Sequence, residues 1–572
     1  MSALTARGAV SAVRAAYQRL AQVGRGNDWI TLRDQADAEA DARAIDARFV
    51  AGDPLPLTGR TFAVKDNIDV AGLLTTAAHP AFAYRPAVSA DCVQQLQAAG
   101  AVILGKTNMD QFATGLVGTR TPYGPVPSAV HPDRVAGGSS AGSATVVAQG
   151  VVDFALGTDT AGSGRVPAAF NAIIGIKPTV GMVSASGVVP ACPSYDTVSV
   201  FTADLALGAD VLRLLSSGTA SRARLSGQRL AAPENPVLAV PRGVDLAILS
   251  AARREAFART VERFVALGAT IREIALTPFL EAAVLLYDGA LVAERGHSFG
   301  TFLADHPEGA DPTVATIAAR AMSVTGPAVI ADQQRLRTLA AAAATELGDA
   351  DALLVPTVPE HPRTADVLAD PFGPNTRLGT YTNFVNLLDL AAVAVPCGTI
   401  ENEGEDSVTL VTRAFEDQVA LDLAARLLGV PQPTLHPEAP LVAVFGAHMR
   451  DLPLNHELRA LGARFVDEIR TAPEYRMYLT DNTPPRPILS PAADGTTIPG
   501  ELWALSPAAV GNLLARIPAP LALGQVRLED GRHVIGFLGT PTGVEEDITA
   551  RGGWRSYLSA RAQADRVPAS LI

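Results

Sequence analysis

The sequence predicts an α/β fold followed by a smaller α+β domain. Between residues 61 and 200, short apolar runs such as TFAVK and AVILG alternate with helix-like segments such as CVQQLQAAG, and glycine turns separate them. Residues 379–430 return to the same alternation. The stretch PQPTLHPEAP at 431–440 has four prolines in ten residues, which indicates a linker between two domains.

The other segments complete this division. Residues 1–57 place Ala, Leu, Arg and Asp at amphipathic spacing, so we expect helices that pack on the outside of the core. The first domain then spans residues 58–430, and its part from 207 to 360 is mostly helical before the strand-like DALLVPTVP. Residues 441–572 restart with the apolar strand LVAVFGAHM and form the second domain.

Composition narrows the class of protein. The chain has 572 residues, 48% of them apolar and 18% charged, which is typical of a globular protein. The net charge of −12 does not favour binding to nucleic acid or to an anionic membrane, which are themselves negatively charged. No apolar run approaches the ~18 residues of a membrane span. The N-terminus lacks the apolar core of a signal peptide. We therefore expect a protein that does not enter a membrane and has a small-molecule partner.

The three cysteines, Cys92, Cys192 and Cys397, have neither the number for a disulfide framework nor the spacing of metal ligands. They fit a reducing cytoplasm.

Lysine is rare. It occurs only at positions 65, 106 and 177, so 43 of the 46 basic residues are arginine. Arginine keeps its proton because its pKa stays above ~12, whereas a buried lysine can become neutral and act as a base. All three lysines lie in the same stretch as the glycine- and serine-rich motifs, which suggests that one of them has a chemical role. The alternative is compositional drift with three surviving lysines.

Two sequence patterns resemble known motifs but lack their context. GAVILGKT at 100–107 matches the phosphate-loop expression GxxxxGK[ST], yet the residues between its glycines form an apolar run that favours a buried strand. GSSAG at 138–142 matches the hydrolase elbow GxSxG around Ser140, but no buried strand precedes it. None of the nine histidines has a motif context for a Ser-His-Asp site.

A glycine- and serine-rich constellation remains: AGGSSAGSA at 136–144 and GTDTAGSGRVPAA at 157–169. Glycine turns expose backbone N–H groups, and a serine in such a turn can act as a nucleophile beside them. Serine needs a base, and a desolvated lysine can supply one. For a single serine, capping or turn formation is the commoner role.

These motifs, together with AVKDNIDV and IIGIKPT, resemble the amidase signature family of Ser-Ser-Lys hydrolases. The resemblance implies a mixed central sheet covered by helices and, carried over residue by residue, makes Ser163 the nucleophile, Ser139 the bridging serine and Lys65 the base. It implies a cis peptide between Gly138 and Ser139. The resemblance also assigns the oxyanion hole to the backbone N–H groups of Thr160, Ala161, Gly162 and Ser163. It implies structural roles for Lys106 and Lys177.

Within that family, the segments VLLYDGALVAER at 284–295, MDQFATGLVGTRTPYG and TNFVNLLDLAAVAVP look like those of the allophanate hydrolases. The resemblance implies that Tyr287 and Arg295 bind the substrate. Eight residues apart, they would lie about two turns along one helix face. A guanidinium suits a substrate that carries a carboxylate. Without the resemblance, core packing for Tyr287 and a salt bridge of Arg295 with Glu294 or another acid would be favoured.

The second domain resembles the gamma-glutamylcyclotransferase-like domain that such enzymes carry, through VFGAHMRDLPLNHEL and PGELWAL. His448 and His456 share the first of these segments, with GAHM expected at a strand end and NHEL at a helix start. One of them is a candidate acid-base group for a second reaction, and His456 is favoured. The alternative is that both are surface or capping residues and the domain serves dimerisation.

The resemblance implies hydrolysis of allophanate to ammonia and carbon dioxide, a functional link to a urea carboxylase, a homodimer, and neither a metal nor an organic cofactor. Three alternatives stay open. They are an amidase acting on carboxylated biuret or a general carboxamide, a glutamine amidotransferase component, and a nucleotide-binding protein that uses GAVILGKT.

Overall fold

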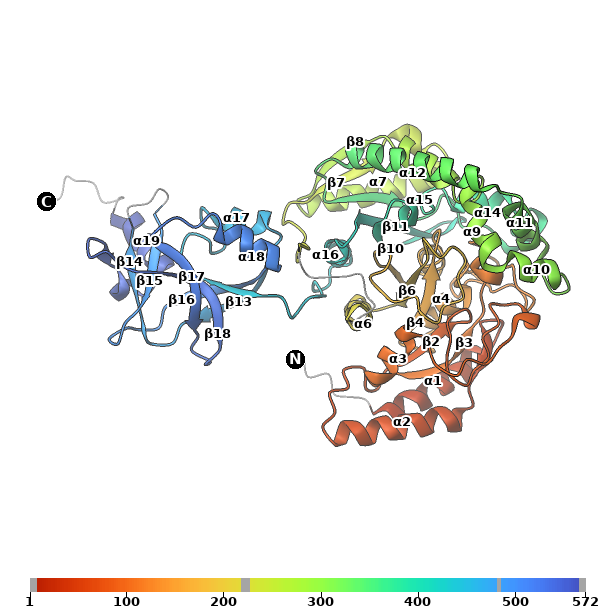
Figure 1. Ribbon diagram of the computed structural model, residues 1–572, viewed down its shortest axis with the longest axis horizontal. Helices are drawn as coiled ribbons and strands as arrows, with labels where there is room; N and C mark the ends of the chain where they lie inside the picture. Colours follow the sequence, from red (N-terminus) through yellow and green to blue (C-terminus); the bar gives the residue numbers. More distant parts are fainter. Residues whose placement is uncertain (1–7, 218–226, 481–484, 565–572) are drawn as a thin grey trace. The chain divides into compact units, whose positions relative to one another are not determined.

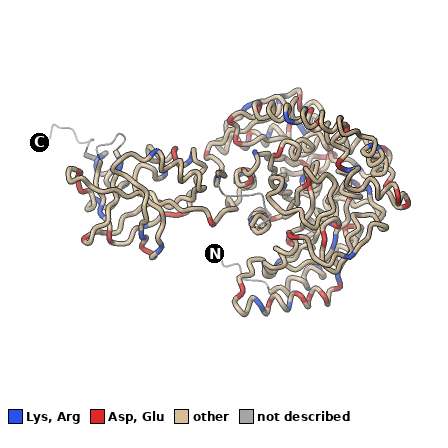
Figure 2. The backbone as a smooth tube through the Cα atoms, viewed as in Figure 1, with Lys and Arg blue, Asp and Glu red and all other residues tan. Residues whose placement is uncertain are grey.

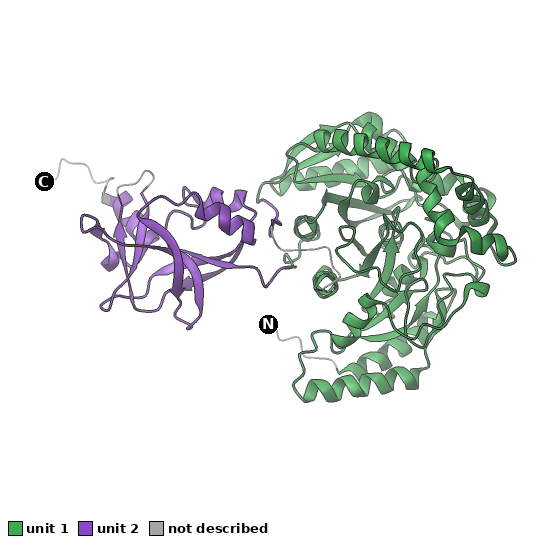
Figure 3. Cartoon of the chain, viewed as in Figure 1, with its two compact units in different colours: residues 1–223, 234–435 green, residues 224–233, 436–572 purple. Residues whose placement is uncertain are grey.

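The computed structural model describes residues 8–217, 227–480 and 485–564. It divides into two compact units, one made of residues 1–223 and 234–435 and the other of residues 224–233 and 436–572 (Figure 3). The second unit therefore takes a short segment from the middle of the chain. Within this unit the amide of Leu230 donates to the carbonyl of Gly462 at 2.8 Å, a pairing that no local sequence pattern indicates.

The first unit is built on an 11-stranded mixed sheet with the spatial order β1-β3-β2-β4-β6-β5-β10-β11-β9-β7-β8 (Figure 1). In chain order its strands are β1 (Trp29–Leu32), β2 (Thr61–Lys65), β3 (Val102–Thr107), β4 (Phe154–Asp159), β5 (Ile174–Lys177), β6 (Thr197–Thr202), β7 (Val237–Pro241), β8 (Thr270–Ile274), β9 (Ala352–Pro356), β10 (Leu390–Ile400) and β11 (Gly404–Arg413).

The first unit also contains helices, and many of them pack on the sheet. They are α1 (Ala9–Val23), α2 (Gln35–Val50), α3 (Asp91–Ala98), α4 (Ala141–Ala148), α5 (Val166–Phe170), α6 (Leu205–Ser216), α7 (Ala251–Ala266), α8 (Thr277–Val284), α9 (Ala293–Arg295), α10 (Thr301–Asp305), α11 (Pro312–Met322), α12 (Gly326–Leu347), α13 (Thr364–Ala369), α14 (Gly373–Leu378), α15 (Phe384–Leu387) and α16 (Asp417–Leu428). Side chains cap several of them. Asp204, for example, accepts hydrogen bonds from the amides of Ala206 and Leu207 at the start of α6.

The N-terminal segment differs in part from the expectation. Residues 1–57 were expected to form helices only, but β1 joins the edge of the sheet antiparallel to β3. Trp29 is 4% exposed and packs in the same apolar cluster as the inner faces of α1 and α2. The strand is only four residues long, too short to separate from its helical neighbours by periodicity.

Strands β2, β3 and β4 bring the glycine- and serine-rich motifs together. β2 is parallel to both of its neighbours, and Phe62 of β2 stacks on Phe154 of β4 with 5.3 Å between ring centroids. Parallel strands end at the same edge of a sheet, so Lys65 and Asp159 reach the same edge. All six residues of β3 are buried, which confirms the prediction that the GAVILGKT run is a strand and not a phosphate loop.

The second unit contains a five-stranded sheet, β13-β16-β12-β18-β17, and a three-stranded sheet, β15-β14-β19. Its strands are β12 (Leu441–Val444), β13 (Arg464–Arg470), β14 (Tyr475–Leu479), β15 (Pro487–Pro491), β16 (Pro499–Ala504), β17 (Leu521–Arg527), β18 (His533–Gly539) and β19 (Glu546–Asp547), and its helices are α17 (Asn455–Ala460), α18 (Pro507–Leu514) and α19 (Trp554–Ala564). The predicted α+β character of this part is confirmed.

Figure 2 shows Lys and Arg interspersed with Asp and Glu along both units. Among the described residues no single helix is long and apolar enough to cross a membrane. The pair α11 and α12, bent by 98°, passes that test only together, by length and composition alone.

Candidate active site

Lys65, the last residue of β2, is fully buried. Its Nζ lies 2.7 Å from the Ser139 Oγ and 2.7 Å from the Thr158 Oγ1. Burial lowers the pKa of Lys65 to about 7, because a charged amine loses its hydration there. A lysine with this pKa is substantially neutral near pH 7 and can accept a proton from a hydroxyl.

Three buried carboxylates, those of Asp110, Asp196 and Asp159, oppose this effect of burial and raise the pKa of Lys65. None of them pairs directly with the amine, because each is committed elsewhere. Asp159 accepts two hydrogen bonds of 2.9 Å from the Arg165 guanidinium. The Lys65 amine thus lies among buried carboxylates and is hydrogen-bonded to hydroxyl groups.

The Gly138–Ser139 peptide bond is cis, as the resemblance implies. Asp110 shapes this turn, because its amide donates to the Ser139 carbonyl at 3.0 Å and its carboxylate accepts from the amides of Val117 and Gly118. A Cβ at position 138 would collide with the Asp110 carboxylate. Only glycine fits at this position.

The neighbouring Ser140 has a different environment. It precedes the first residue of α4, and its Oγ donates to the carbonyl of Thr158 at 3.2 Å. Bends and a loop precede it, not a buried strand. The GxSxG pattern around Ser140 is therefore not a hydrolase elbow.

Ser163 lies in the turn between β4 and α5 and is 2% exposed. Asp159 fixes this turn, because its carboxylate accepts from the amides of Gly162 at 2.9 Å and Gly164 at 3.0 Å. Gly162 has a φ of +131°, and a Cβ there would lie 2.6 Å from the Thr382 Oγ1. Both conditions require glycine.

The amide groups of this turn divide into two sets. The Gly162 N–H, one of the expected oxyanion donors, is already bound to Asp159. Within the described part of the chain, the N–H groups of Thr160, Ala161 and Ser163 have no acceptor. These three amides, and not that of Gly162, are free to meet a developing oxyanion.

Tyr287 and Arg295 meet, although not on one helix as expected. Tyr287 lies in a turn after α8, a 3-10 turn follows at Ala290–Val292, and Arg295 ends α9. The Arg295 guanidinium carbon nevertheless stands 4.0 Å from the centroid of the Tyr287 ring. This contact is a cation–π interaction.

Arg295 is 0% exposed, and its Nη1 donates to the Leu286 carbonyl at 3.2 Å. Its Nε and Nη2 have no hydrogen-bond partner in the described structure. The alternative, a salt bridge with Glu294, is not among the ion pairs of the described residues, and the Glu294 carboxylate accepts from the amide of Ser194. Two buried donors without acceptors are costly, and they match the two oxygens of a carboxylate.

The other two lysines bind backbone and side-chain oxygens. The Lys106 Nζ lies 3.0 Å from the Thr75 Oγ1 and 3.7 Å from the Asp66 Oδ1, and the Lys177 Nζ donates to the Leu390 carbonyl at 2.7 Å. These contacts fit the structural roles expected for both.

Known proteins share the sequence and fold that carry this geometry. A family profile described as Amidase matches residues 11–421, well over half of the chain. The chain belongs to the amidase family. A second profile, described as Allophanate hydrolase C-terminal domain, matches residues 440–559. The resemblance drawn from the sequence motifs and the fold expected from it are confirmed.

This amidase is 35% identical to a solved structure of Kluyveromyces lactis allophanate hydrolase, with a TM-score of 0.87 and coverage of 97% of this chain and 98% of that one. It is 37% identical to the urea amidolyases of Lachancea kluyveri and Saccharomyces cerevisiae, over 94% and 93% of this chain but 31% of each relative. The chain thus spans about a third of the length of these curated relatives. A glutamyl-tRNA(Gln) amidotransferase component of Streptococcus thermophilus is 37% identical over 46% of this chain and 55% of its own length.

In the second unit of the amidase, the two candidate histidines differ. His456 is exposed near the start of α17, and its ring Nδ1 hydrogen-bonds to the carbonyl of Pro453 at 2.8 Å. His448 is 7% exposed, lies 2.9 Å from Glu457 and stacks on Phe537. Burial lowers the pKa of His448. The structure therefore favours His448 over His456, the reverse of the sequence-based preference.

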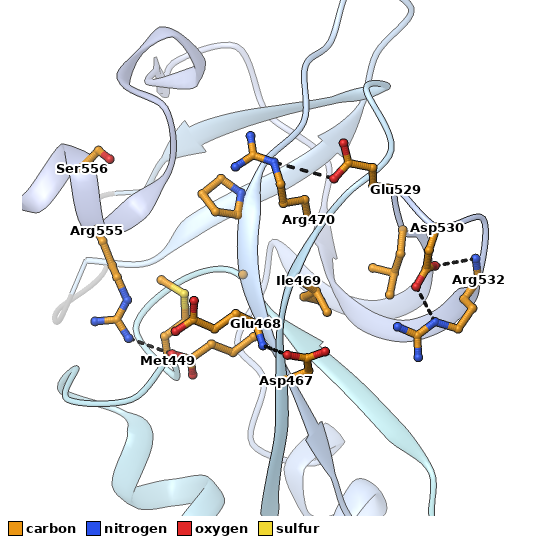
Figure 4. A pocket seen from close by; sticks show the side chains of 14 residues that line it. Met449, Asp467, Glu468, Ile469, Arg470, Glu529, Asp530, Arg532, Arg555 and Ser556 are labelled. Atoms are coloured by element: carbon orange, nitrogen blue, oxygen red, sulfur yellow. Dashed lines mark hydrogen bonds and ion pairs between the residues drawn. The ribbon is translucent and has the colours of Figure 1, made fainter. Parts of the chain in front are cut away.

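His448 also lines a small cavity with Arg486, whose Nε is buried and has no partner in the described structure. A larger cavity of about 670 Å³ lies between β13, β16 and the start of α19 (Figure 4). Its three arginines are paired with carboxylates: Arg470 with Glu529, Arg532 with Asp530 and Arg555 with Glu501. Among the described residues, no group of three or more His, Cys, Asp or Glu side chains could hold a metal ion.

Several residues of the amidase site were not found from the sequence. They are Asp110, Thr158, Asp159, Arg165 and Asp196. Thr158, Asp159 and Arg165 belong to the motif GTDTAGSGR that contains Ser163, so their position in this motif was a usable signal. Asp110 and Asp196 come from other segments, and only the sheet register brings them to the site.

Proposed function

We propose that this amidase hydrolyses allophanate (urea-1-carboxylate) in the degradation of urea, releasing ammonia and, by way of N-carboxycarbamate, carbon dioxide. The buried Arg295, with two donors that lack acceptors, carries the proposal. Allophanate has a carboxylate beside its terminal amide, and a planar guanidinium binds a carboxylate through two parallel hydrogen bonds. The Tyr287 ring holds the guanidinium plane in place.

In the proposed reaction, neutral Lys65 accepts the proton of the Ser139 hydroxyl, and Ser139 accepts that of Ser163. The Ser163 Oγ then attacks the carbonyl carbon of the terminal amide. The oxygen of that carbonyl gains negative charge among the N–H groups of Thr160, Ala161 and Ser163. When the C–N bond breaks, the relay returns a proton to the nitrogen, which leaves as ammonia.

Water then attacks the acyl-enzyme through the same relay. The Ser163 oxygen leaves with a proton, and N-carboxycarbamate is released. Every step uses proton transfers among Lys65, Ser139 and Ser163. The groups that hold the carboxylate, Arg295 and Tyr287, take no part in proton transfer and serve recognition.

The test is to measure ammonia release by the purified full chain from allophanate, urea, biuret and glutamine side by side. We expect turnover of allophanate to exceed that of the other three substantially. Faster turnover of biuret or an uncharged carboxamide would favour a different amidase specificity, and glutaminase activity would favour an amidotransferase component. The control is Ser163→Ala, which separates this activity from that of a contaminating amidase.

A second reaction is proposed for the second unit. N-carboxycarbamate carries two carboxylates, and His448 stands beside the partnerless Arg486 Nε in one small cavity. A neutral histidine next to a guanidinium suits acid-base assistance to the loss of carbon dioxide from a bound carboxylate. His456, the other candidate, serves better as a matched control because it is exposed.

We further propose a cytoplasmic homodimer that works with a urea carboxylase, the enzyme class whose product would be allophanate. Three free cysteines, of which Cys92 and Cys192 are buried, fit a reducing compartment. The similarity to urea amidolyases that are about three times longer supports a link to a further enzyme activity. Size-exclusion chromatography with light scattering tests the dimer.

A further inference from the structure

Asp196 has no role in the mechanism above, yet it connects the amide-donating turn, the base and the substrate arginine. We propose that Asp196 is a positioning residue with two roles. It holds the turn through the Thr160 hydroxyl, and its negative charge interacts with Arg295 before a substrate carboxylate binds. This inference rests on the proposed function. It concerns how the site is prepared for an anionic substrate.

The sheet register explains why Asp196 reaches the turn. β4 and β6 are antiparallel neighbours, and Asp159 at the end of β4 pairs with Thr197 at the start of β6. The residue after Asp159 and the residue before Thr197 therefore leave the sheet together. These residues are Thr160 and Asp196, and the Thr160 Oγ1 donates to the Asp196 Oδ1.

The backbone around Asp196 is fixed on both sides. Its Oδ2 accepts from the amides of Ala191 at 2.8 Å and Cys192 at 3.0 Å. The Asn386 side-chain amide donates at 2.8 Å to the carbonyl of Asp159 and at 2.8 Å to that of Tyr195. Asn386 thus ties together the residues that precede Thr160 and Asp196. A carboxylate held this rigidly can fix the position of Thr160 and, through it, the adjacent amide donors.

The charge of Asp196 acts in two directions. Burial raises the pKa of Asp196 to about 6, while Thr160, the two amides and Arg295 oppose the rise, so the group is mainly ionised above that pH. It interacts electrostatically with Arg295, which also faces the Cys192 thiol and Tyr287. It is also one of the three carboxylates, with Asp110 and Asp159, that face Lys65.

This arrangement has a consequence for a substrate that carries a carboxylate. In the free enzyme the Asp196 carboxylate interacts electrostatically with Arg295. A bound substrate carboxylate shares the same guanidinium and is repelled by Asp196. Removing this charge while keeping the hydrogen bonds should strengthen binding of an anionic substrate, leave a neutral one unaffected, and make Lys65 easier to deprotonate.

Asp196→Asn separates charge from position. An asparagine can turn its Oδ1 toward the two amides and donate from its Nδ2 to the Thr160 Oγ1, so both links remain. For allophanate we expect KM to fall roughly threefold to tenfold, with KM for an uncharged carboxamide unchanged. The acidic limb of the kcat profile should move to lower pH, because a positive Lys65 loses one stabilising neighbour.

Thr160→Val tests position alone. It removes the hydroxyl but keeps the size of the side chain and the Asp196 charge. We expect kcat to fall about tenfold or more on both substrates, with the pH profile and the KM ratio unchanged. Asp210→Asn, an exposed acid of α6, is the matched control and should change neither quantity.

The outcomes are separable. If the wild-type chain fails to hydrolyse allophanate, the proposed function fails. If it hydrolyses allophanate but Asp196→Asn shifts neither the pH limb nor the ratio of the two KM values, the charge role of Asp196 is wrong. If Thr160→Val keeps full kcat, its positioning role is wrong. Thermal unfolding of each variant identifies a loss of activity that comes from misfolding, and Thr160→Val, the milder change, then decides the positioning role.

Discussion

The active site of the first unit and the large cavity of the second unit differ in how they treat buried charge. In the first unit, Lys65 is buried among hydroxyls and Arg295 keeps two donors without acceptors. In the second unit, the cavity of about 670 Å³ has its arginines paired with carboxylates (Figure 4). Incompletely compensated charge costs stability and is retained where it is used. We therefore expect chemistry at the site where buried charge lacks partners.

The same distinction separates the three lysines. Lys177 donates to two backbone carbonyls, those of Leu390 and Pro178, which stabilise a charged amine and cannot give up a proton. Lys65 instead contacts two hydroxyls, and one of them can donate to it. Burial lowers the pKa of both, that of Lys177 to about 8, so the lowered pKa alone does not distinguish the proposed base from the other lysine. The partners do.

The largest expected effect comes from the relay itself. Ser163→Ala and Lys65→Arg should each lower kcat by about a thousandfold or more, because the first removes the nucleophile and the second replaces a base by a guanidinium that keeps its proton. Ser140→Ala is the matched control, since its hydroxyl donates to a backbone carbonyl. Steady-state ammonia release measures all three. A Lys65→Arg enzyme with near wild-type turnover contradicts the relay.

A smaller loss is expected at the substrate arginine. Arg295→Lys should weaken recognition of allophanate by ~2–4 kcal/mol, because one ammonium cannot reproduce two parallel hydrogen bonds to a buried carboxylate. The measurement is kcat/KM on allophanate and on an uncharged carboxamide. Equal losses on both substrates would show that Arg295 has only a structural role.

The pH dependence follows from the base. In the proposed relay the neutral form of Lys65 is active, and its pKa is about 7, so kcat should rise with pH and reach half its plateau near pH 7. Below that value the rate should fall about tenfold for each pH unit. A profile of kcat between pH 5 and 9 measures this, with circular dichroism at each pH to exclude unfolding. A flat profile down to pH 5 contradicts a lysine base.

The sequence carried much of the fold and of the site, for identifiable reasons. The fully buried strands β3 and β4 contain apolar runs that can be recognised in the sequence. The glycines of the motifs can be recognised as well, and the structure explains them by close contacts such as that of Gly138 with Asp110. The relay residues lie in dense local motifs. What could not be predicted depends on long-range register, as in the pairing of Asp159 with Thr197 that brings Asp196 beside Thr160.

Other errors had local causes. A spacing of eight residues suggested one helix for Tyr287 and Arg295, but the chain turns after α8 and the two side chains meet through an irregular segment. The resemblance assigns the Gly162 amide to the oxyanion hole, but a linear motif does not show that the Asp159 carboxylate accepts from this amide. The choice between His456 and His448 stays a prediction, because spacing says nothing about which ring is buried.

The smallest expected effect concerns the second unit and decides whether its chemistry resembles that of the first. Removing residues beyond 430 is a poor test, because residues 227–233 of the second unit would lose their partners, among them Gly462. Point variants of the full chain avoid this. His448→Ala should leave the first release of ammonia unchanged and delay carbon dioxide, because the imidazole between Glu457 and Phe537 is lost. The delay should be modest, since N-carboxycarbamate also decomposes unaided.

His456→Ala is the matched control, and rapid-quench measurement of ammonia and carbon dioxide follows both products. If both variants release carbon dioxide without delay, the second unit has no part in the reaction. A delay in His456→Ala alone would return the role to the exposed histidine.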